Sequence, residues 1–284
     1  MCWSRLLAAL ILTGPFLATS ALADKGDYVL GAGVSADDAD GIAVIAIGDL
    51  SVAEHTWLSG SVGRTNVELS PRRTLKTWYT DIGIDHFWSP AGARLGVAYW
   101  GDPSLLDSVD VVASIYTRGE AGMISVDGEH RELELELPPI DILPRALIPF
   151  KANGLGLSGR LNLSSRWNLR FAGKSYEYNV NLRSEDAARL INLLSVSRLS
   201  LLSSLIDWRV SAGIGVDVGS KRWELDAAKW RSAVDGGDNR SITLSFLTPM
   251  TDRTDLEINL GYDDSDLYGQ VTVLNLFIYF YGVD

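Results

Sequence analysis

The chain closes with the stretch LYGQVTVLNLFIYFYGVD, residues 267–284, and this stretch raises the question that decides the fold. It is a long run of β-branched and aromatic residues, the types that favour strands, and the nearest charge before it is Asp266. A soluble domain could use such a run as a buried central strand. A chain that ends inside lipid could use it as the strand that closes a barrel.

Segments with a period of two residues recur along the chain, each about ten residues long and bounded by turn residues. In TDLEINLGYDD, for example, Leu256, Ile258 and Leu260 alternate with Glu257 and Asn259. The polar faces mix Gly, Ser, Asn, Asp and Arg, as a narrow hydrated interior requires. A secreted antiparallel sandwich or a soluble barrel would alternate in the same way, so that interpretation stays open.

Aromatic residues recur at the ends of these segments, which favours the barrel in lipid, because such barrels carry aromatic girdles around an outward apolar band. The residues expected in these girdles are Trp57, Trp88, Tyr99, Trp208, Trp223 and Tyr281. A bundle of membrane helices is excluded, because the longest apolar-looking internal stretch, ARLINLLSVSRLSLLSSLIDW, contains Arg189, Asn192 and Arg198.

The first 23 residues, MCWSRLLAALILTGPFLATSALA, have the pattern of a secretory signal peptide. Arg5 supplies a positive start, Leu6 to Leu12 an apolar core, and Ala21 to Ala23 a small-x-small cleavage pattern. We expect cleavage before Asp24, and a single domain over residues 24–284. A retained N-terminal anchor is the alternative, but the apolar run is shorter than the roughly 20 residues that span a bilayer.

Composition narrows the possible functions. The only cysteine, Cys2, lies in the expected leader, so the processed chain would have no disulfide and no cysteine metal site. The 25 Lys and Arg residues stand against 36 Asp and Glu residues, a formal charge of −11 without basic clusters. That balance argues against nucleic-acid binding, which depends on neutralising phosphates.

The signal peptide, the alternating segments and the terminal strand from Leu267 to Tyr281 together resemble bacterial outer-membrane β-barrel proteins as a class. The resemblance implies an all-β, antiparallel transmembrane β-barrel, here with about 12 to 14 wall strands. It also implies contact with outer-membrane lipid and lipopolysaccharide, and insertion by the barrel-assembly machinery. One departure is that three residues follow Tyr281, whereas members commonly end on an aromatic residue that this machinery recognises.

Some segments depart from the wall pattern. The Pro-rich stretch within residues 138–153 predicts a loop folded against the rim or into the lumen, since proline cannot donate to a ladder. Residues 184–206 open with an N-cap-like Ser184 and predict a helical insertion, either a plug, an interfacial helix or a loop decoration; a strand is the alternative. Asp127-Gly128 and the stretch FAGKSY predict hairpins. The short connections SPAG, GSKR and TPMTDR should share one end of the barrel, and the acidic connections the other.

The inner wall should carry the polar residues of the alternating segments. The stretch EHRELELELPP is the most unusual, because its glutamates share one face and would need cationic partners or would favour cations. The candidates for lining the lumen are Asp81, Asp85, Arg94, Glu132, Glu134, Glu136, Arg160, Arg170, Arg209, Asp217, Glu257 and Asn259.

Three functions are consistent with an outer-membrane barrel that has a polar inner wall. The first is a porin-like channel for small polar solutes, and the second is a structural or adhesive barrel with a filled lumen. The third is a lipid-modifying hydrolase of the outer membrane. For the hydrolase, His130 is the one histidine that alternation places on the inner wall, with no serine supplied to it. We expect no catalytic residues, no metal and no cofactor.

Overall fold

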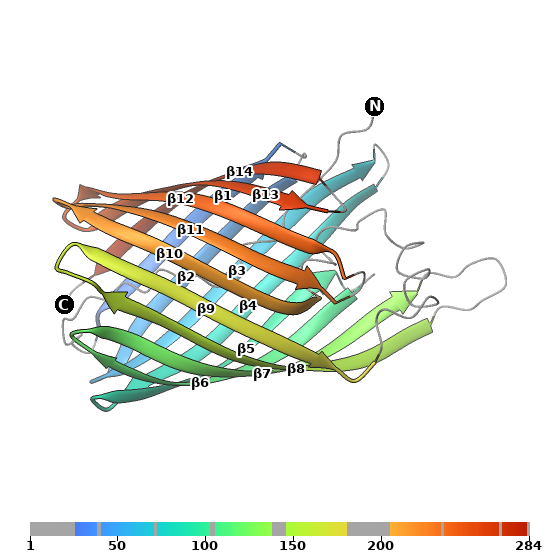
Figure 1. Cartoon of the computed structure of the whole chain (residues 1–284), viewed down its shortest axis with the longest axis horizontal. Coiled ribbons are helices and arrows are strands. Elements are labelled where there is room, and N and C mark those ends of the chain that lie inside the picture. The colour runs from blue at the N-terminus through green and yellow to red at the C-terminus, as the bar shows by residue number, and fades with distance from the viewer. Residues whose placement is uncertain are drawn as a thin grey trace.

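The protein is a closed antiparallel β-barrel of fourteen strands (Figure 1). The computed structural model describes residues 26–38, 41–70, 73–102, 106–137, 146–180, 205–233, 236–266 and 269–282. The strands are β1 (Tyr28–Asp37), β2 (Gly41–Ala53), β3 (Thr56–Ser70), β4 (Arg73–Phe87), β5 (Ala91–Asp102), β6 (Leu106–Gly119), β7 (Gly122–Leu137), β8 (Ala146–Asn162), β9 (Trp167–Tyr178), β10 (Ile206–Val218), β11 (Lys221–Ser232), β12 (Asp238–Thr251), β13 (Thr254–Ser265) and β14 (Gly269–Gly282). The predicted fold class and the upper limit of the predicted strand number are both confirmed.

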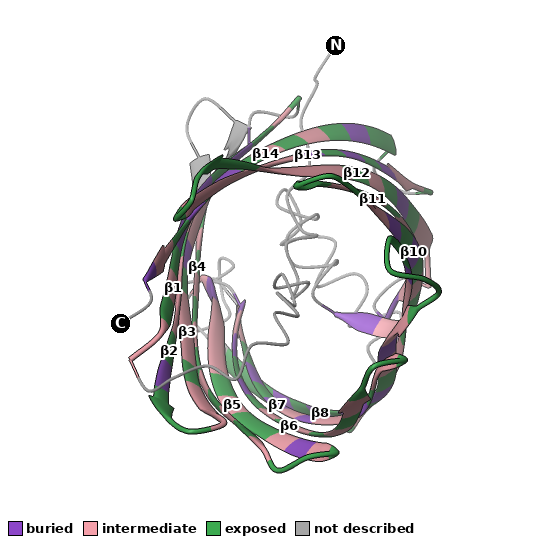
Figure 2. Cartoon of the chain, turned by 90° about the vertical axis from the view of Figure 1, so that its left-hand side faces the viewer, coloured by how far each residue is buried: buried purple, intermediate pink, exposed green. Residues whose placement is uncertain are grey.

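The C-terminal stretch forms the closing strand. β14 pairs with β13 on one side and with β1 on the other, so that Leu276 lies opposite Val34 and the ring has no free edge (Figure 2). Closure matters in lipid, because an unpaired backbone N–H or C=O has no water to bind there.

The two ends of the barrel differ in their connections. Residues 54–55, 88–90, 120–121, 163–166, 219–220 and 252–253 join strands at one end, here called the turn end. The three short connections predicted to share an end all lie there. The acidic connections, at residues 37–41, 66–73, 102–107, 235–239 and 263–266, all lie at the opposite end, here called the loop end. This asymmetry between short turns and longer loops is typical of outer-membrane barrels.

Apolar side chains point away from the ring and remain exposed, which defines the outer face of the wall. Figure 2 shows the resulting alternation of exposed and less exposed residues along the strands. The exposed apolar residues come from nearly every strand and include Leu30, Val44, Val62, Ile82, Leu95, Val111, Val126, Leu157, Ile214, Leu225, Leu244, Leu260 and Leu276. A surface of this kind suits acyl chains.

Glycines on the inner face make room for aromatic rings at the closing seam. Gly31 and Gly33 of β1 lie opposite Tyr279 and Phe277 of β14. The two rings stack with their centroids 6.1 Å apart. A Cβ on Gly33 would lie 2.3 Å from ring carbons of Phe277, so only glycine fits beneath that ring.

Both predicted hairpins are wrong. Asp127 and Gly128 lie within β7, where Gly128 pairs with Ala113 of β6 and Leu155 of β8. The stretch FAGKSY, residues 171–176, lies within β9. At both places, pairing with a strand on each side outweighs the local preference of the sequence for a turn.

The predicted loop over residues 138–153 is wrong for its second half. Residues 138–145 lie outside the described residues, but β8 begins at Ala146 and includes Pro149, which lies opposite Glu134. β8 pairs with β9 only from Ala152 onward, so Pro149 stands where β8 has one neighbour and its missing N–H costs no ladder bond. The predicted helical insertion over residues 184–206 lies outside the described residues up to 204, and Ile206 begins β10.

The polarity of the wall reverses near the loop end. Along β7 the outer face changes from Ile124 and Val126 to Glu132 and Glu134, while the inner face changes from polar residues to the buried Leu133. With 16 and 17 residues, β7 and β8 exceed the 9–11 residues or so that cross a bilayer. Their loop-end parts therefore extend past the acyl chains, where the outside is wet.

Candidate functional site

The inner face of the barrel carries most of the predicted lumen residues. Residues directly opposite each other in a ladder share a face, so the register assigns each side chain to one side of the wall. By this criterion the residues on the inner face are Asp81, Asp85, Arg94, Arg160, Arg170, Arg209, Asp217, Glu257 and Asn259.

Ion pairs between strands brace this wall toward the turn end. Arg94 donates through Nε and Nη2 to Asp85 Oδ2 at 3.0 and 2.8 Å, and Tyr116 donates to the other oxygen of Asp85 at 2.5 Å. Two further clusters lie on β9 to β11. Arg170 bridges Glu224 and Asp226, and Arg222 donates to Asp217 at 2.7 Å.

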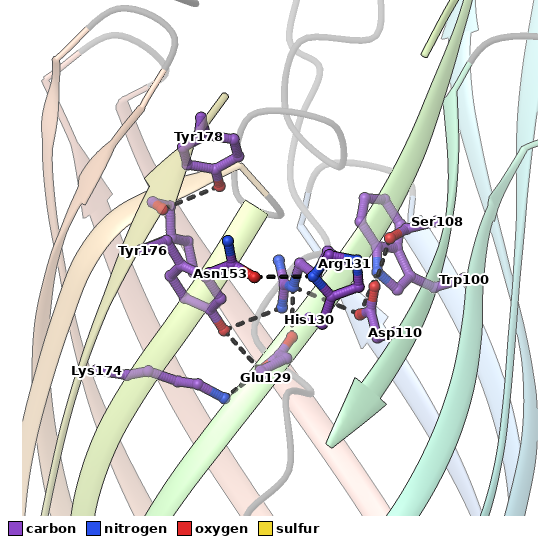
Figure 3. A network of polar contacts seen from close by, with 11 residues as sticks. Trp100, Ser108, Asp110, Glu129, His130, Arg131, Asn153, Lys174, Tyr176 and Tyr178 are labelled. Atoms are coloured by element: carbon purple, nitrogen blue, oxygen red, sulfur yellow. Dashed lines mark hydrogen bonds and ion pairs between the residues drawn. The ribbon is translucent and has the colours of Figure 1, made fainter. Parts of the chain in front are cut away.

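A larger polar network lies higher on the wall, between β5 and β9, and sequence reasoning missed it (Figure 3). Its centre is Glu129, which accepts from Arg131 and Lys174 and, at 3.0 Å, from the hydroxyl of Tyr176. Arg131 Nη2 also donates to Tyr176 at 3.1 Å, and the Arg131 side chain is only 7% exposed. The buried Arg131 and the partly exposed Lys174 thus share one buried carboxylate.

The network extends to β6 and β5. Arg131 Nε lies 3.5 Å from Asp110 Oδ2, which also accepts from Trp100 Nε1 at 3.0 Å. Ser108 donates to the other oxygen of Asp110. Glu129 and Arg131 share the inner phase of β7, a signal present in the sequence. The predicted turn at Asp127-Gly128 hid it, because it placed the start of a new strand after Gly128.

The placement of Glu132, Glu134 and Glu136 on the inner wall is wrong. Glu132 lies opposite Val109 of β6 and Lys151 of β8, both on the outer face, and its Oε1 is 2.5 Å from Lys151 Nζ. Glu134 and Glu136 share its phase. The three carboxylates stand where β7 has passed the apolar band, so water rather than a lumen network solvates them.

Apolar side chains take the inner positions at the same height. They form a buried cluster, here called the loop-end cluster, against which Trp100, Leu135, Tyr178 and Ala228 also pack. Its members are Leu106, Leu133, Phe150, Ala152, Tyr176, Leu205, Ile206, Trp230 and Ala233. The inner wall is therefore apolar at the loop end of β5 to β11 and charged below it.

The predicted girdle residues divide between the two faces. Trp88, Tyr99, Trp208 and Trp223 lie on the outer face, Trp88 and Trp223 toward the turn end and the other two toward the loop end. Two placements are wrong, and the register gives the reason.

Trp57 lies opposite Ser51 and Asp85, and Tyr281 donates to Asp255 at 3.0 Å, so both face inward. Position at a strand end does not determine which face a side chain occupies.

The histidines pair with neutral or acidic groups in the part of the chain that the structure describes. His86 Nδ1 is 2.8 Å from Thr56 Oγ1, and His130 Nδ1 is 2.8 Å from Asn153 Oδ1. His130 is on the outer face, not the inner wall as predicted, because it shares its phase with Glu132. His55 lies in a turn, 3.6 Å from Glu54. Among these ranges no group of three His, Cys, Asp or Glu side chains is arranged to hold a metal ion.

Within the same described ranges, no helix is long and apolar enough to cross a membrane.

Comparison with known proteins gives a structural similarity alone. No family model matches the sequence, and no curated protein does. Among solved structures, the monoaromatic hydrocarbon channel CymD aligns over 92% of this chain and 89% of its own, with 8% identity and a TM-score of 0.55.

Two further structures align comparably. The Pseudomonas putida toluene transporter TodX aligns over 91% of this chain and 90% of its own, with 7% identity and a TM-score of 0.51. A loop deletion mutant of OmpT, an outer membrane protein of Vibrio cholerae, aligns over 90% of this chain and 98% of its own, with 8% identity and a TM-score of 0.51. The fold is that of bacterial outer-membrane β-barrels.

Proposed function

We propose that this chain is a porin-like channel of the bacterial outer membrane that passes small polar solutes. The observation that carries the proposal is the opposite polarity of the two faces over the same strands. Between the turn end and the loop-end cluster, the outer face is apolar and the inner face holds charged side chains such as Arg94, Arg170 and Glu257. A charged inner surface provides hydrogen-bonding partners for a hydrated solute.

The polarity of the inner wall favours polar over apolar cargo. CymD and TodX are named for hydrocarbons, but similarity at 7–8% identity extends only to the fold. A hydrocarbon would have to pass the ion pairs around Asp85 and Asp217, whose charged groups it cannot hydrogen-bond. Small ions, sugars and amino acids meet no such penalty.

Planar-bilayer recording tests the proposal directly. Protein extracted from outer membranes in detergent should give stepwise currents, and heat-modifiable migration on a gel should verify that the barrel is folded. Liposomes containing the protein should swell in small neutral sugars. A folded barrel that gives neither currents nor swelling would refute the channel.

A structural or adhesive barrel with a filled lumen is the second candidate. It is favoured by the buried network around Glu129 and by the loop-end cluster, which together cover much of one inner wall with mutually satisfied groups. Silent bilayers from folded protein support this alternative over the channel.

Placement in the outer membrane implies further partners that we include in the proposal. Residues 1–23 would be removed on export, and β14 would be the strand that the assembly machinery recognises. Lys229, Arg231 and Arg240 share the outer face near the loop end, where lipopolysaccharide phosphates lie. Replacing these three by glutamine should lower the amount of lipopolysaccharide that copurifies with the barrel, whereas unchanged copurification would contradict this contact.

A further inference from the structure

The cations of the inner face are confined to one half of the barrel. Of the inner-face side chains that the structure describes, every arginine and lysine lies on the contiguous strands β5 to β11, and none lies on β12 to β14 or β1 to β4. The inner cations are Arg94, Arg118, Arg131, Arg160, Arg170, Lys174, Arg209 and Arg222.

The other half of the wall, here called the acidic wall, carries carboxylates. Its acidic residues are Asp37, Asp49, Asp81, Asp85, Asp255, Glu257 and Asp263. Most of them lie toward the turn end, at the start of β13 and the end of β2 and β4. The two halves of the lumen therefore differ in charge over the same height.

The partners of the acidic wall are mostly neutral. Tyr281 donates to Asp255 at 3.0 Å, Tyr279 donates to Glu257 at 2.7 Å, and Ser61 donates to Asp81. A hydroxyl donor satisfies a hydrogen bond but leaves the negative charge in place. Asp85 differs, because it pairs with Arg94 where the two halves meet. Arg94 also attracts Asp49, and Arg209 attracts Asp263.

Most carboxylates of the opposite half pair with cations, although Asp127 accepts from the hydroxyls of Ser125 and Ser158. Glu224 and Asp226 share Arg170, Asp217 pairs with Arg222, and Glu129 accepts from two cations. Among the side chains that the structure describes, that half is close to neutral as a surface, so their net charge on the inner face belongs to the acidic wall. Within a lumen flanked by low-dielectric protein and lipid, a surface of one sign concentrates counter-ions.

We infer that the lumen selects for cations, and that it does so along the acidic wall through Asp49, Asp255 and Glu257. The inference rests on the proposed function, because selectivity has meaning only for an open channel. The solute class is small hydrated cations, which the three carboxylates attract, while tyrosine hydroxyls hold Asp255 and Glu257 in place.

The test uses reversal potentials in planar bilayers across a steep gradient of KCl. The wild-type channel should pass potassium in preference to chloride. The variant D49N/D255N/E257Q keeps the hydrogen-bond acceptors for Tyr279 and Tyr281 but removes three charges, and it should lower the potassium-to-chloride permeability ratio at least about twofold.

A matched variant tests whether the effect depends on where the charges are removed rather than on how many are removed. E132Q/E134Q/E136Q removes the same number of carboxylates from the outer face of β7, and it should leave the ratio unchanged. If the inner triple variant fails to fold, as judged by heat-modifiable migration, the single variant E257Q and the wild-type reversal potential decide instead.

The outcomes are distinct. Open wild-type channels without cation preference, or a ratio that both triple variants change equally, would overturn the inference and leave the channel standing. Folded protein without any current would overturn the proposed function itself.

Discussion

The Phe277 ring occupies the space above Gly33 at the seam where the first and last strands meet. A Cβ on Gly33 would lie 2.3 Å from two ring carbons, and a Cβ on Gly31 would lie 2.7 Å from Ile47 and 3.0 Å from the Tyr279 ring. The seam that closes the barrel is thus held by ladder hydrogen bonds and by rings that fit only over glycine. It joins the two ends of the chain, whose pairing spans the largest sequence separation in the fold.

Substituting Gly33 with valine should destabilise the barrel. The added carbons would displace Phe277, and overpacking of this kind costs about 1–3 kcal/mol. Urea unfolding in micelles, followed by tryptophan fluorescence, measures the loss. Gly128→Val is the control. Gly128 lies on the outer face of β7, and the nearest atom to a Cβ there is a backbone oxygen 3.9 Å away. Equal losses in the two variants would show that the ring over Gly33 is not the cause.

Removing Arg131 should cost far more than removing an exposed arginine. Arg131→Met leaves Glu129 and Asp110 buried with less compensation, and breaking a buried pair costs about 3–5 kcal/mol. Arg240 pairs with Asp264 on the outer face with 76% of its side chain exposed, so Arg240→Met should cost less than about 1 kcal/mol. Thermal and urea unfolding of both variants give the comparison. Similar losses would mean that the network in Figure 3 contributes no more than a surface pair.

The position of the membrane boundary on β7 predicts that a lysine destabilises the barrel strongly at one outer position and little at another. Val126→Lys puts a charge in the apolar band and should destabilise the folded barrel in lipid by about 2–4 kcal/mol. Glu134→Lys lies on the same face beyond the reversal of polarity and should change stability by about 1 kcal/mol or less. Folding titrations in phospholipid vesicles measure both. A larger effect at residue 134 would place the acyl chains around Glu134 instead.

Cysteine labelling should distinguish the two faces of β7 at the loop end. The only natural cysteine, Cys2, lies in the expected leader, so single substitutions can be labelled without background. On intact cells a membrane-impermeant maleimide should react quickly with Glu134→Cys and slowly with Leu133→Cys, since Leu133 is 1% exposed. Fast labelling at residue 133 and slow labelling at residue 134 would reverse the assigned faces.

The alternation of side chains predicted antiparallel strands with one apolar and one polar face. In β13, Leu256, Ile258 and Leu260 alternate with Glu257 and Asn259, and a period of two divides any strand into two faces whatever its neighbours are. The aromatic terminal strand and the succession of similar segments then predict a barrel, because only closure removes the edges of an antiparallel sheet in lipid.

The faces of β7 show what alternation leaves open. It separates Glu132, Glu134 and Glu136 from Leu133 and Leu135 correctly, but it does not say which set points inward. Within the bilayer the apolar side chains face outward, and beyond the bilayer they face inward while the charged ones face outward. Only the register with β6 and β8 fixes where along the strand that change occurs.

Two-faced strands could be predicted from the sequence, because the faces depend on local spacing, and the aromatic terminal strand favoured a barrel. Which charges meet follows only from the folded ring. Glu129 lies 45 residues from Lys174, and Arg170 lies 54 residues from Glu224, so these contacts depend on register and closure. Among the described side chains, the confinement of the inner cations to β5 to β11 arises in the same way, since neighbours around a ring are set by pairing rather than by distance along the chain.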